Sequence, residues 1–244
     1  MPKTLICYLS CMLLMYSYAQ AQNPNEATHT PNEMAWQVYE QAIEKNQLIS
    51  QGKVYGYLYP QASGSHYIMD EKEEGRLVYD GLTYKNMALY YDMYNDLIFF
   101  STKQDGLQRY LILDQQKISA YQIGDLHFIH LFSSPDTMVK KGLYQLAFEQ
   151  GAIRLLVKKR KELIRDAGQM AGQKRYKFVN ADVHYLFKQE GLFIIKRKKD
   201  LLKAFGNHSE LKSFIKKEGI RLKANRGDFT SQLVRALMYK ESSS

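Results

Sequence analysis

Short stretches in which apolar and polar residues alternate follow one another from Val54 to Arg197, and they predict β-strands. Turn residues separate them at the spacing of antiparallel hairpins, not of strand–helix–strand units. After the first strands, the pattern predicts further strands at residues 117–123, 126–132, 142–149, 152–161, 174–180, 183–188 and 191–197. We therefore expect a mainly antiparallel β body over residues 54–197, as a curved sheet or a β-sandwich.

Apolar residues at helical spacing flank this β body on both sides. Thr30, Pro31 and Glu33 form a helix start with Thr30 as N-cap and Glu33 closing a capping box, which predicts a helix over residues 30–49. Three short helices are predicted over residues 198–240 from three apolar stripes: Leu201, Leu202 and Phe205; Leu211, Phe214 and Ile215; Phe229, Leu233, Leu237 and Tyr239. These helices should cover one end of the sheet. Residues 30–240 should thus form a single α+β domain, followed by a frayed tail at 241–244.

The ends of the C-terminal helices carry recognisable signals. Gly206 should end the first helix, and Gly219 should occupy the C′ position of the second. Asn207 with Glu210 resembles a capping pair for the second helix.

The most aromatic part of the chain is "GRLVYDGLTYKNMALYYDMYNDLIFF" at residues 75–100. Asp80-Gly81 is a two-residue turn signal, because both positions tolerate positive φ. The turn pairs Tyr79 with Leu82, Val78 with Thr83, and Leu77 with Tyr84. Alternation then puts Leu77, Tyr79, Leu82 and Tyr84 on one buried face, which assigns the first two tyrosines to packing.

The alternation changes beyond Asn86. Met87, Leu89 and Tyr91 take over the buried side, which predicts a bulge or bend near Asn86. The continuous apolar runs at 97–100 and 110–113 are expected to be strands covered on both faces. Tyr90, Tyr91 and Tyr94 remain open between packing and ligand binding, and the preference of tyrosine for strands favours packing.

The first 21 residues have the layout of an export signal. Lys3 forms a short positive region, Leu5 to Tyr18 form an apolar region, and Ala19 and Ala21 suit signal peptidase. We expect cleavage after Ala21, a polar disordered segment at 22–29, and a location in the periplasm or at the outer membrane. The alternative is a lipoprotein acylated at Cys11, although the apolar run continues beyond that cysteine.

The candidate chemistry is sparse. Both cysteines, Cys7 and Cys11, lie in the signal, so the mature chain has no disulfide, thiol nucleophile or cysteine–zinc site. His127 and His130 form an HxxH motif, but residues three apart in a strand point to opposite faces. His66 and His184 lie in strand-like segments without a recognisable partner in the sequence. We assign no catalytic residue, no metal ligand and no cofactor.

The charge is unevenly distributed along the chain. Residues 1–139 hold 9 Lys and Arg against 15 Asp and Glu, whereas residues 140–244 hold 25 against 10. Two basic blocks follow apolar strands, and their members are the candidate sites for an anion or a partner: Lys158, Lys159, Arg160 and Lys161; Lys196, Arg197, Lys198 and Lys199. Only alternate members of a block share a face in a strand. If the two strands are adjacent, at least four cations converge near one sheet edge.

Export limits what such blocks can bind. It argues against nucleic acid and leaves an acidic envelope protein, an anionic glycan or a lipid head group as partners. A solvated basic surface without a partner is the alternative interpretation.

Two segments carry a resemblance to a family. The run from Gly75 to Phe100, continuing to "YLILDQQKISAYQIGDLHFIHL", and the tail "FIIKRKKDLLKAFGNHSELKSFIKKEGIRLKANRGDFTSQLVRALMY" resemble exported proteins of the Bacteroidota without a functional name. The resemblance covers most of residues 50–240 and implies an envelope location, but it implies no functional residue. We expect a non-enzymatic protein that binds an envelope component. The alternative is a hydrolase of envelope glycans or lipids that uses carboxylates not identifiable from the sequence.

Overall fold

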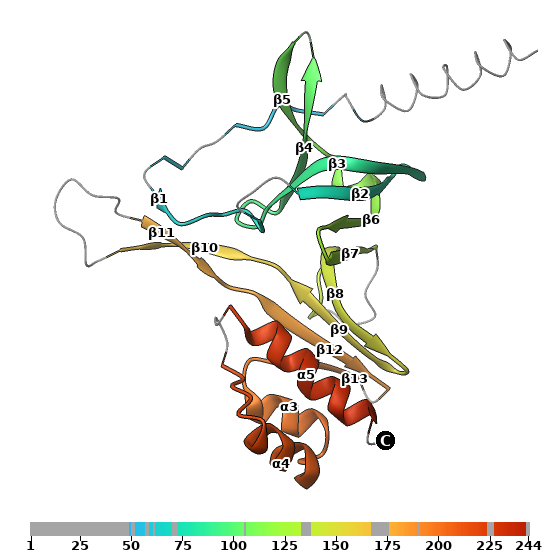
Figure 1. Ribbon diagram of the computed structural model, residues 1–244, viewed down its shortest axis with the longest axis vertical. Helices are drawn as coiled ribbons and strands as arrows, with labels where there is room; N and C mark the ends of the chain where they lie inside the picture. Colours follow the sequence, from blue (N-terminus) through green and yellow to red (C-terminus); the bar gives the residue numbers. More distant parts are fainter. Residues whose placement is uncertain are drawn as a thin grey trace, which may run out of the picture. The chain divides into compact units, whose positions relative to one another are not determined.

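A computed structural model describes Ile49 and residues 52–56, 59–60, 62–69, 73–104, 106–132, 138–166, 176–189, 191–223 and 227–242 (Figure 1). Its main sheet is built from the strands β2 Glu73–Tyr79, β3 Leu82–Asp92, β4 Leu97–Gln104, β5 Leu107–Ile112, β6 Ile118–Ile123, β7 Leu126–Leu131, β8 Gly142–Gln150, β9 Ile153–Lys158, β12 Val183–Lys188 and β13 Gly191–Ile194. A smaller sheet contains β1 Ala62–Ser63, β10 Lys161–Arg165 and β11 Tyr176–Asn180. A 3-10 turn, η1 Gln115–Lys117, precedes β6, and three helices follow the strands: α3 Lys198–Ala204, α4 Ser209–Lys217 and α5 Phe229–Ser242.

The main sheet is antiparallel throughout, in the order β13-β12-β9-β8-β7-β6-β2-β3-β4-β5. The hairpins β2 to β5 extend it in one direction, and β6 returns to pair with the free side of β2. The smaller sheet has the order β1-β11-β10, with β1 and β11 parallel. The prediction of a mainly antiparallel β protein with C-terminal helices is confirmed.

The predicted strand at 152–161 is two strands. β9 ends at Lys158 and β10 begins at Lys161, so β9 pairs with β12 in the main sheet and β10 pairs with β11 in the smaller one. Between them, the N–H of Ala181 donates to the carbonyl of Arg160 at 2.9 Å, which joins the two ladders. The first basic block therefore lies at a junction within a long hairpin and not at its end (Figure 1).

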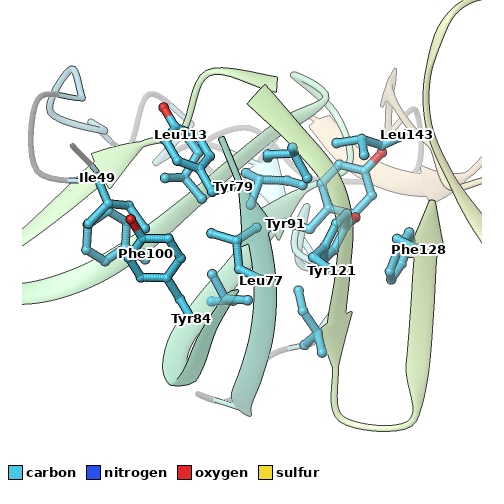
Figure 2. Packing of buried hydrophobic residues seen from close by; sticks show 14 of the residues in the cluster. Ile49, Leu77, Tyr79, Tyr84, Tyr91, Phe100, Leu113, Tyr121, Phe128 and Leu143 are labelled. Atoms are coloured by element: carbon cyan, nitrogen blue, oxygen red, sulfur yellow. The ribbon is translucent and has the colours of Figure 1, made fainter. Parts of the chain in front are cut away.

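The hairpin at Asp80-Gly81 has the predicted register. Its three pairs are Tyr79 with Leu82, Val78 with Thr83, and Leu77 with Tyr84, and both turn residues have positive φ, 52° and 78°. Leu77, Tyr79 and Tyr84 are buried, as Figure 2 shows. Leu82 is 38% exposed, so its predicted burial is wrong. β4 pairs with β3 only from Leu89 onward, so the Leu82 end of the strand has no second neighbouring strand among the residues that the structure describes.

The predicted bulge at Asn86 is confirmed. The register between β2 and β3 shifts between Gly75 and Leu77, and Asn86 has a φ of 55°. The buried parity changes there, because Tyr84 is buried before the bulge while Leu89 and Tyr91 are buried after it. One extra residue in β3 thus exchanges the two faces of the strand, so that odd-numbered residues face the core beyond the bulge.

One row of paired residues crosses the sheet from β3 to β12 on a single face, since directly opposite residues share a face. Its members are Tyr84, Leu77, Tyr121, Phe128, Gln145, Val157 and His184. The row begins in a first core, built on β2 to β8 and shown in Figure 2. It ends in a second core that β9 and β12 share with the three helices. Gln145 lies between the two cores. A third cluster, around Tyr144, Leu156 and Tyr185, occupies the opposite face.

Of the predicted ends of the C-terminal helices, the C-terminal end of α4 is confirmed, and the N-cap predicted for α4 is wrong. Gly219 has a φ of 62° after α4, and the N–H of Ile220 donates to the carbonyl of Ile215 at 3.0 Å, which is the expected glycine-terminated end. Asn207 does not cap α4, whose N-cap is His208. With a φ of 60°, Asn207 instead donates its N–H to the carbonyl of Leu202 and so completes the end of α3.

Several predictions lie outside the described residues. These are the signal segment, the stretch at 22–29, and the helix at 30–49 apart from Ile49, which is helical and packs in the first core. The predicted frayed tail at 241–244 is wrong for its first two residues, because α5 continues through Ser242, and residues 243–244 lie outside the described ranges. Within the described ranges, no helix has the length and apolar character needed to cross a membrane.

Candidate ligand-binding groove

The two basic blocks lie at the same end of the main sheet but not on adjacent strands. β12 separates β9 from β13, because Lys158 pairs with Val183 and Ile194 pairs with Tyr185. The convergence that adjacent strands would produce is therefore absent. The two blocks have different surroundings.

The first block divides by alternation, as a strand requires. Lys159 and Lys161 line one groove. Lys158 points elsewhere: its Nζ lies 2.8 Å from both carboxylate oxygens of Asp96 and donates to the carbonyl of Leu143 at 3.0 Å. The guanidinium of Arg160 donates to Glu162 at 2.9 Å on the exposed surface.

The second block contributes nothing to this groove. Lys196 and Arg197 line a separate depression of about 550 Å³ that also contains Asp200. The carboxylate of Asp200 accepts the backbone N–H groups of Lys196 and Arg197, both at 3.1 Å. Lys198 and Lys199 belong to the first turn of α3.

The groove has a volume of about 700 Å³ and occupies the part of the sheet face between the two cores. Three parts of the chain form it: strands of the two sheets, the segment before β2 with the turn after β3, and α5. Its described lining residues are Ser65, Tyr67, Ile68, Met93, Leu126, Gln145, Ala147, Lys159, Lys161, Asn180, Gly227, Thr230, Ser231, Val234, Arg235 and Met238. They include three cations and no carboxylate.

Backbone hydrogen bonds hold the basic end of the groove together. The N–H of Lys161 donates to the carbonyl of Met93 at 3.1 Å, and the N–H of Met93 donates to the carbonyl of His66 at 2.9 Å. The ammonium of Lys159 forms an ion pair with Asp182, whose other carboxylate oxygen accepts the N–H of Arg160 at 2.9 Å. The side chain of Lys159 and the backbone of Lys161 are therefore held in place by neighbouring segments.

The helix α5 presents one face to the second core and another to the groove. Phe229, Leu233, Ala236 and Leu237 are buried, while Thr230, Val234 and Met238 line the groove at helical spacing. At the start of the helix, His184 Nε2 and Thr230 Oγ1 are 2.8 Å apart. Burial lowers the pKa of His184 to about 4, so the ring is neutral at pH 7.

A buried polar cluster supports the opposite wall. Asp92 is fully buried, and its Oδ2 accepts the hydroxyl of Tyr55 at 2.9 Å and the amide of Asn95 at 2.7 Å. Its Oδ1 accepts the backbone N–H groups of Tyr94 and Asn95. His66 lies with its Nε2 3.0 Å from the hydroxyl of Tyr55 and 3.7 Å from Asp92. The cluster anchors Ser65 and Tyr67, the groove residues on either side of His66.

The pKa values of this cluster agree with a structural role. Burial lowers the pKa of His66 against the opposing effect of Asp92, which favours the neutral imidazole at pH 7. Burial also raises the pKa of Tyr55, and its hydrogen bonds with Tyr67 and Asp92 raise it further. No partner of His66 could be recognised from the sequence, because Tyr55 and Asp92 belong to other segments and no spacing motif connects the three.

The three tyrosines whose role the sequence left undecided between packing and ligand binding have different environments. Tyr91 is in the first core and donates to Asp96 at 2.7 Å. Tyr94 is 37% exposed. Tyr90 stacks on Phe99 with 5.0 Å between ring centroids, and Tyr55 stacks on Phe99 at 4.0 Å. With Tyr67 and Tyr110, these rings line a slot of about 370 Å³. Packing thus accounts for Tyr91, while Tyr90 contributes to a small aromatic cavity.

The described residues contain no group of three His, Asp or Glu side chains arranged for a metal ion. His127 is exposed and His130 is buried, in agreement with their expected placement on opposite faces of β7. Glycan hydrolysis would need two carboxylates about 5–10 Å apart. The described lining of the groove supplies none.

Comparison with protein-family models, with curated proteins and with solved structures found no match to this chain.

Proposed function

We propose that the protein is a non-enzymatic component of the cell envelope that binds an anionic ligand in the groove beside α5. The observation that carries the proposal is the placement of Lys159 and Lys161 in one concavity whose described lining includes no carboxylate. The predicted export signal and the resemblance to exported proteins support the envelope location. N-terminal sequencing of the mature protein should begin at Gln22, and a lipidated Cys11 would contradict the cleavage site.

The two lysines are suited to capture an anion because contacts hold the side chain of Lys159 and the backbone of Lys161. Lys159 is 19% exposed and paired with Asp182, which is 14% exposed, so both charges are partly withdrawn from water. Lys161 follows at the next position on the same face, with its backbone bonded to Met93. An anion in the groove meets the ammonium group of Lys161 and that of Lys159, and the ion pair with Asp182 means that Lys159 loses little side-chain freedom on binding. Hydrogen bonds to charged groups contribute about 1.5–3 kcal/mol each.

Titration calorimetry with tripolyphosphate tests the proposal, since this soluble polyanion carries no apolar group. The double variant Lys159→Gln with Lys161→Gln should bind at least about tenfold more weakly than wild type. The matched control, Lys198→Gln with Lys199→Gln, removes the same charge outside the groove and should bind like wild type. Binding should also weaken from low to physiological salt, where the Debye length is about 8 Å. Equal weakening in the two double variants would show that the overall charge, and not the groove, binds the anion.

A further inference from the structure

The floor of the groove changes from basic to apolar along its length. Lys159 and Lys161 lie at one end, near Leu143 at the start of β8, whose carbonyl accepts Lys158. Gln145 follows two residues along β8. Ala147 continues the floor away from the basic end, and Leu126 accompanies it from the far end of β7.

The lining that α5 contributes changes from polar to apolar in the same direction as the floor. Thr230 and Ser231, with hydroxyl groups, lie at the basic end, because Thr230 contacts His184 near the beginning of β12. The helix then runs towards the turn between β8 and β9, where Glu241 lies against Gly151. Val234 and Met238 follow on the groove face, over about 12 Å of helix from Thr230. Arg235 is an exception to this change from polar to apolar residues, and its guanidinium is paired with Glu218.

The third side repeats the pattern. Ser65 lies beside His66, which is hydrogen-bonded through Met93 to the basic end. Ile68 lies further along, and the neighbouring Met69 reaches Gly124 in the turn that precedes Leu126. Three separate parts of the chain therefore present polar or cationic groups at one end and apolar groups at the other.

We propose that the ligand of this groove is an anionic amphiphile, whose charged head lies at Lys159 and Lys161 and whose hydrocarbon chain lies along Leu126, Ala147 and Met238. This inference rests on the proposed function and specifies its ligand. A small soluble anion uses only the basic end. Met238 is 58% exposed on the groove wall, and a hydrocarbon chain removes such surface from water. A wholly hydrophilic glycan leaves the apolar end uncovered.

Alkyl phosphates of increasing chain length test the inference, below their micelle concentrations and by titration calorimetry. From butyl to decyl phosphate, the affinity should rise about fourfold for each methylene that becomes buried, which corresponds to about 0.8 kcal/mol. Decyl maltoside, with the same chain and an uncharged head, should bind at least about tenfold more weakly than decyl phosphate. Equal affinities for butyl and decyl phosphate would contradict an amphiphilic ligand. That result would leave the anion-binding groove itself untouched, because tripolyphosphate binding tests the groove independently. Decyl maltoside binding as tightly as decyl phosphate would overturn the anionic head.

Two exposed apolar residues provide a matched pair of variants. Met238→Glu should remove most of the gain from butyl to decyl phosphate, because a carboxylate then occupies the apolar end. Leu107→Glu changes a residue that is 63% exposed on β5 and outside the groove lining, and it should keep the full gain. Lys161→Gln should weaken all the alkyl phosphates by a similar factor and leave the gain per methylene unchanged. A gain that survives Met238→Glu intact would overturn the proposed position of the chain.

Discussion

The backbone N–H of Lys161 donates a 3.1 Å hydrogen bond to the carbonyl oxygen of Met93, across 68 positions of the chain. Met93 belongs to the turn after β3, and Lys161 opens β10 in the smaller sheet. This contact brings the second half of the long hairpin against the first core and closes one end of the groove. A basic residue that would otherwise lie on an open strand is thereby placed in a concavity.

The hairpin at Asp80-Gly81 provides a test of the first core. Leu77→Ala should lower the free energy of unfolding by about 2–5 kcal/mol, because Leu77 has no exposed surface. Leu82→Ala should lower it by about 1 kcal/mol or less, since Leu82 is 38% exposed on the same hairpin. Urea denaturation of both variants measures the difference. Equal losses would contradict the placement of Leu82 at an open strand end.

The hydrogen bonds around the buried Asp92 predict that removing the hydroxyl group of Tyr55 lowers the stability of the protein. Tyr55→Phe keeps the ring that stacks on Phe99 but removes a donor from the fully buried Asp92, which should cost about 1.5–3 kcal/mol of stability. Tyr59→Phe is the matched control, because its hydroxyl donates to the neutral amide oxygen of Asn95 in an exposed position. Its cost should be about 1 kcal/mol or less, and thermal denaturation compares the two. A larger loss for Tyr59→Phe would show that Asp92 does not depend on Tyr55.

His184 predicts a loss of stability in acid. Its pKa is about 4 in the folded protein and about 6.5 in the unfolded chain, so between these values the unfolded state binds the proton more readily. The contribution of the neutral ring is fully present above pH 6.5 and should decline by about 3 kcal/mol in total as the pH falls through 4. His184→Gln does not titrate, and the difference between the two pH profiles isolates this residue. Parallel profiles would contradict the buried neutral imidazole.

The second core predicts that the helices and the sheet unfold together. Leu233 and Leu237 of α5 have no exposed surface and share a core with Leu155 of β9. Truncation after Lys199 should therefore expose strand surface and cause aggregation, measured by size-exclusion chromatography. A monomeric truncated protein with an unchanged melting transition would show instead that the helices form a separate unit.

Local features of this fold could be predicted because short-range chemistry determines them. Asp80 and Gly81 favour positive φ, Asn86 accommodates the bulge, and Gly219 ends α4. Leu82 was predicted wrongly because its burial depends on whether β4 reaches it, which no local pattern shows. Asn207 was assigned to the wrong helix because the same residue type suits an N-cap and a left-handed helix end.

The groove depends on contacts that are distant in the sequence. Lys158 meets Asp96 across 62 positions, and Lys159 meets Asp182 across 23. Alternation correctly separated Lys159 and Lys161 from Lys158 and Arg160, but nothing in the sequence showed that Met93 and α5 would enclose the first pair. The second block looked equivalent to the first, yet its strand ends before it and α3 includes its last two lysines.

Methionine methyl NMR tests the central claim most directly. Met93 and Met238 line the groove on different walls, while Met138 is 54% exposed outside the groove lining. On titration of octyl phosphate into protein labelled at the methionine methyl groups, the signals of Met93 and Met238 should shift together and saturate at one ligand per chain, and Met138 should stay in place. In the Lys159→Gln, Lys161→Gln variant, the same shifts should need at least about tenfold more ligand. Shifts at Met138 without shifts at Met93 and Met238, or the same titration curve in wild type and variant, would contradict an anion-binding groove beside α5.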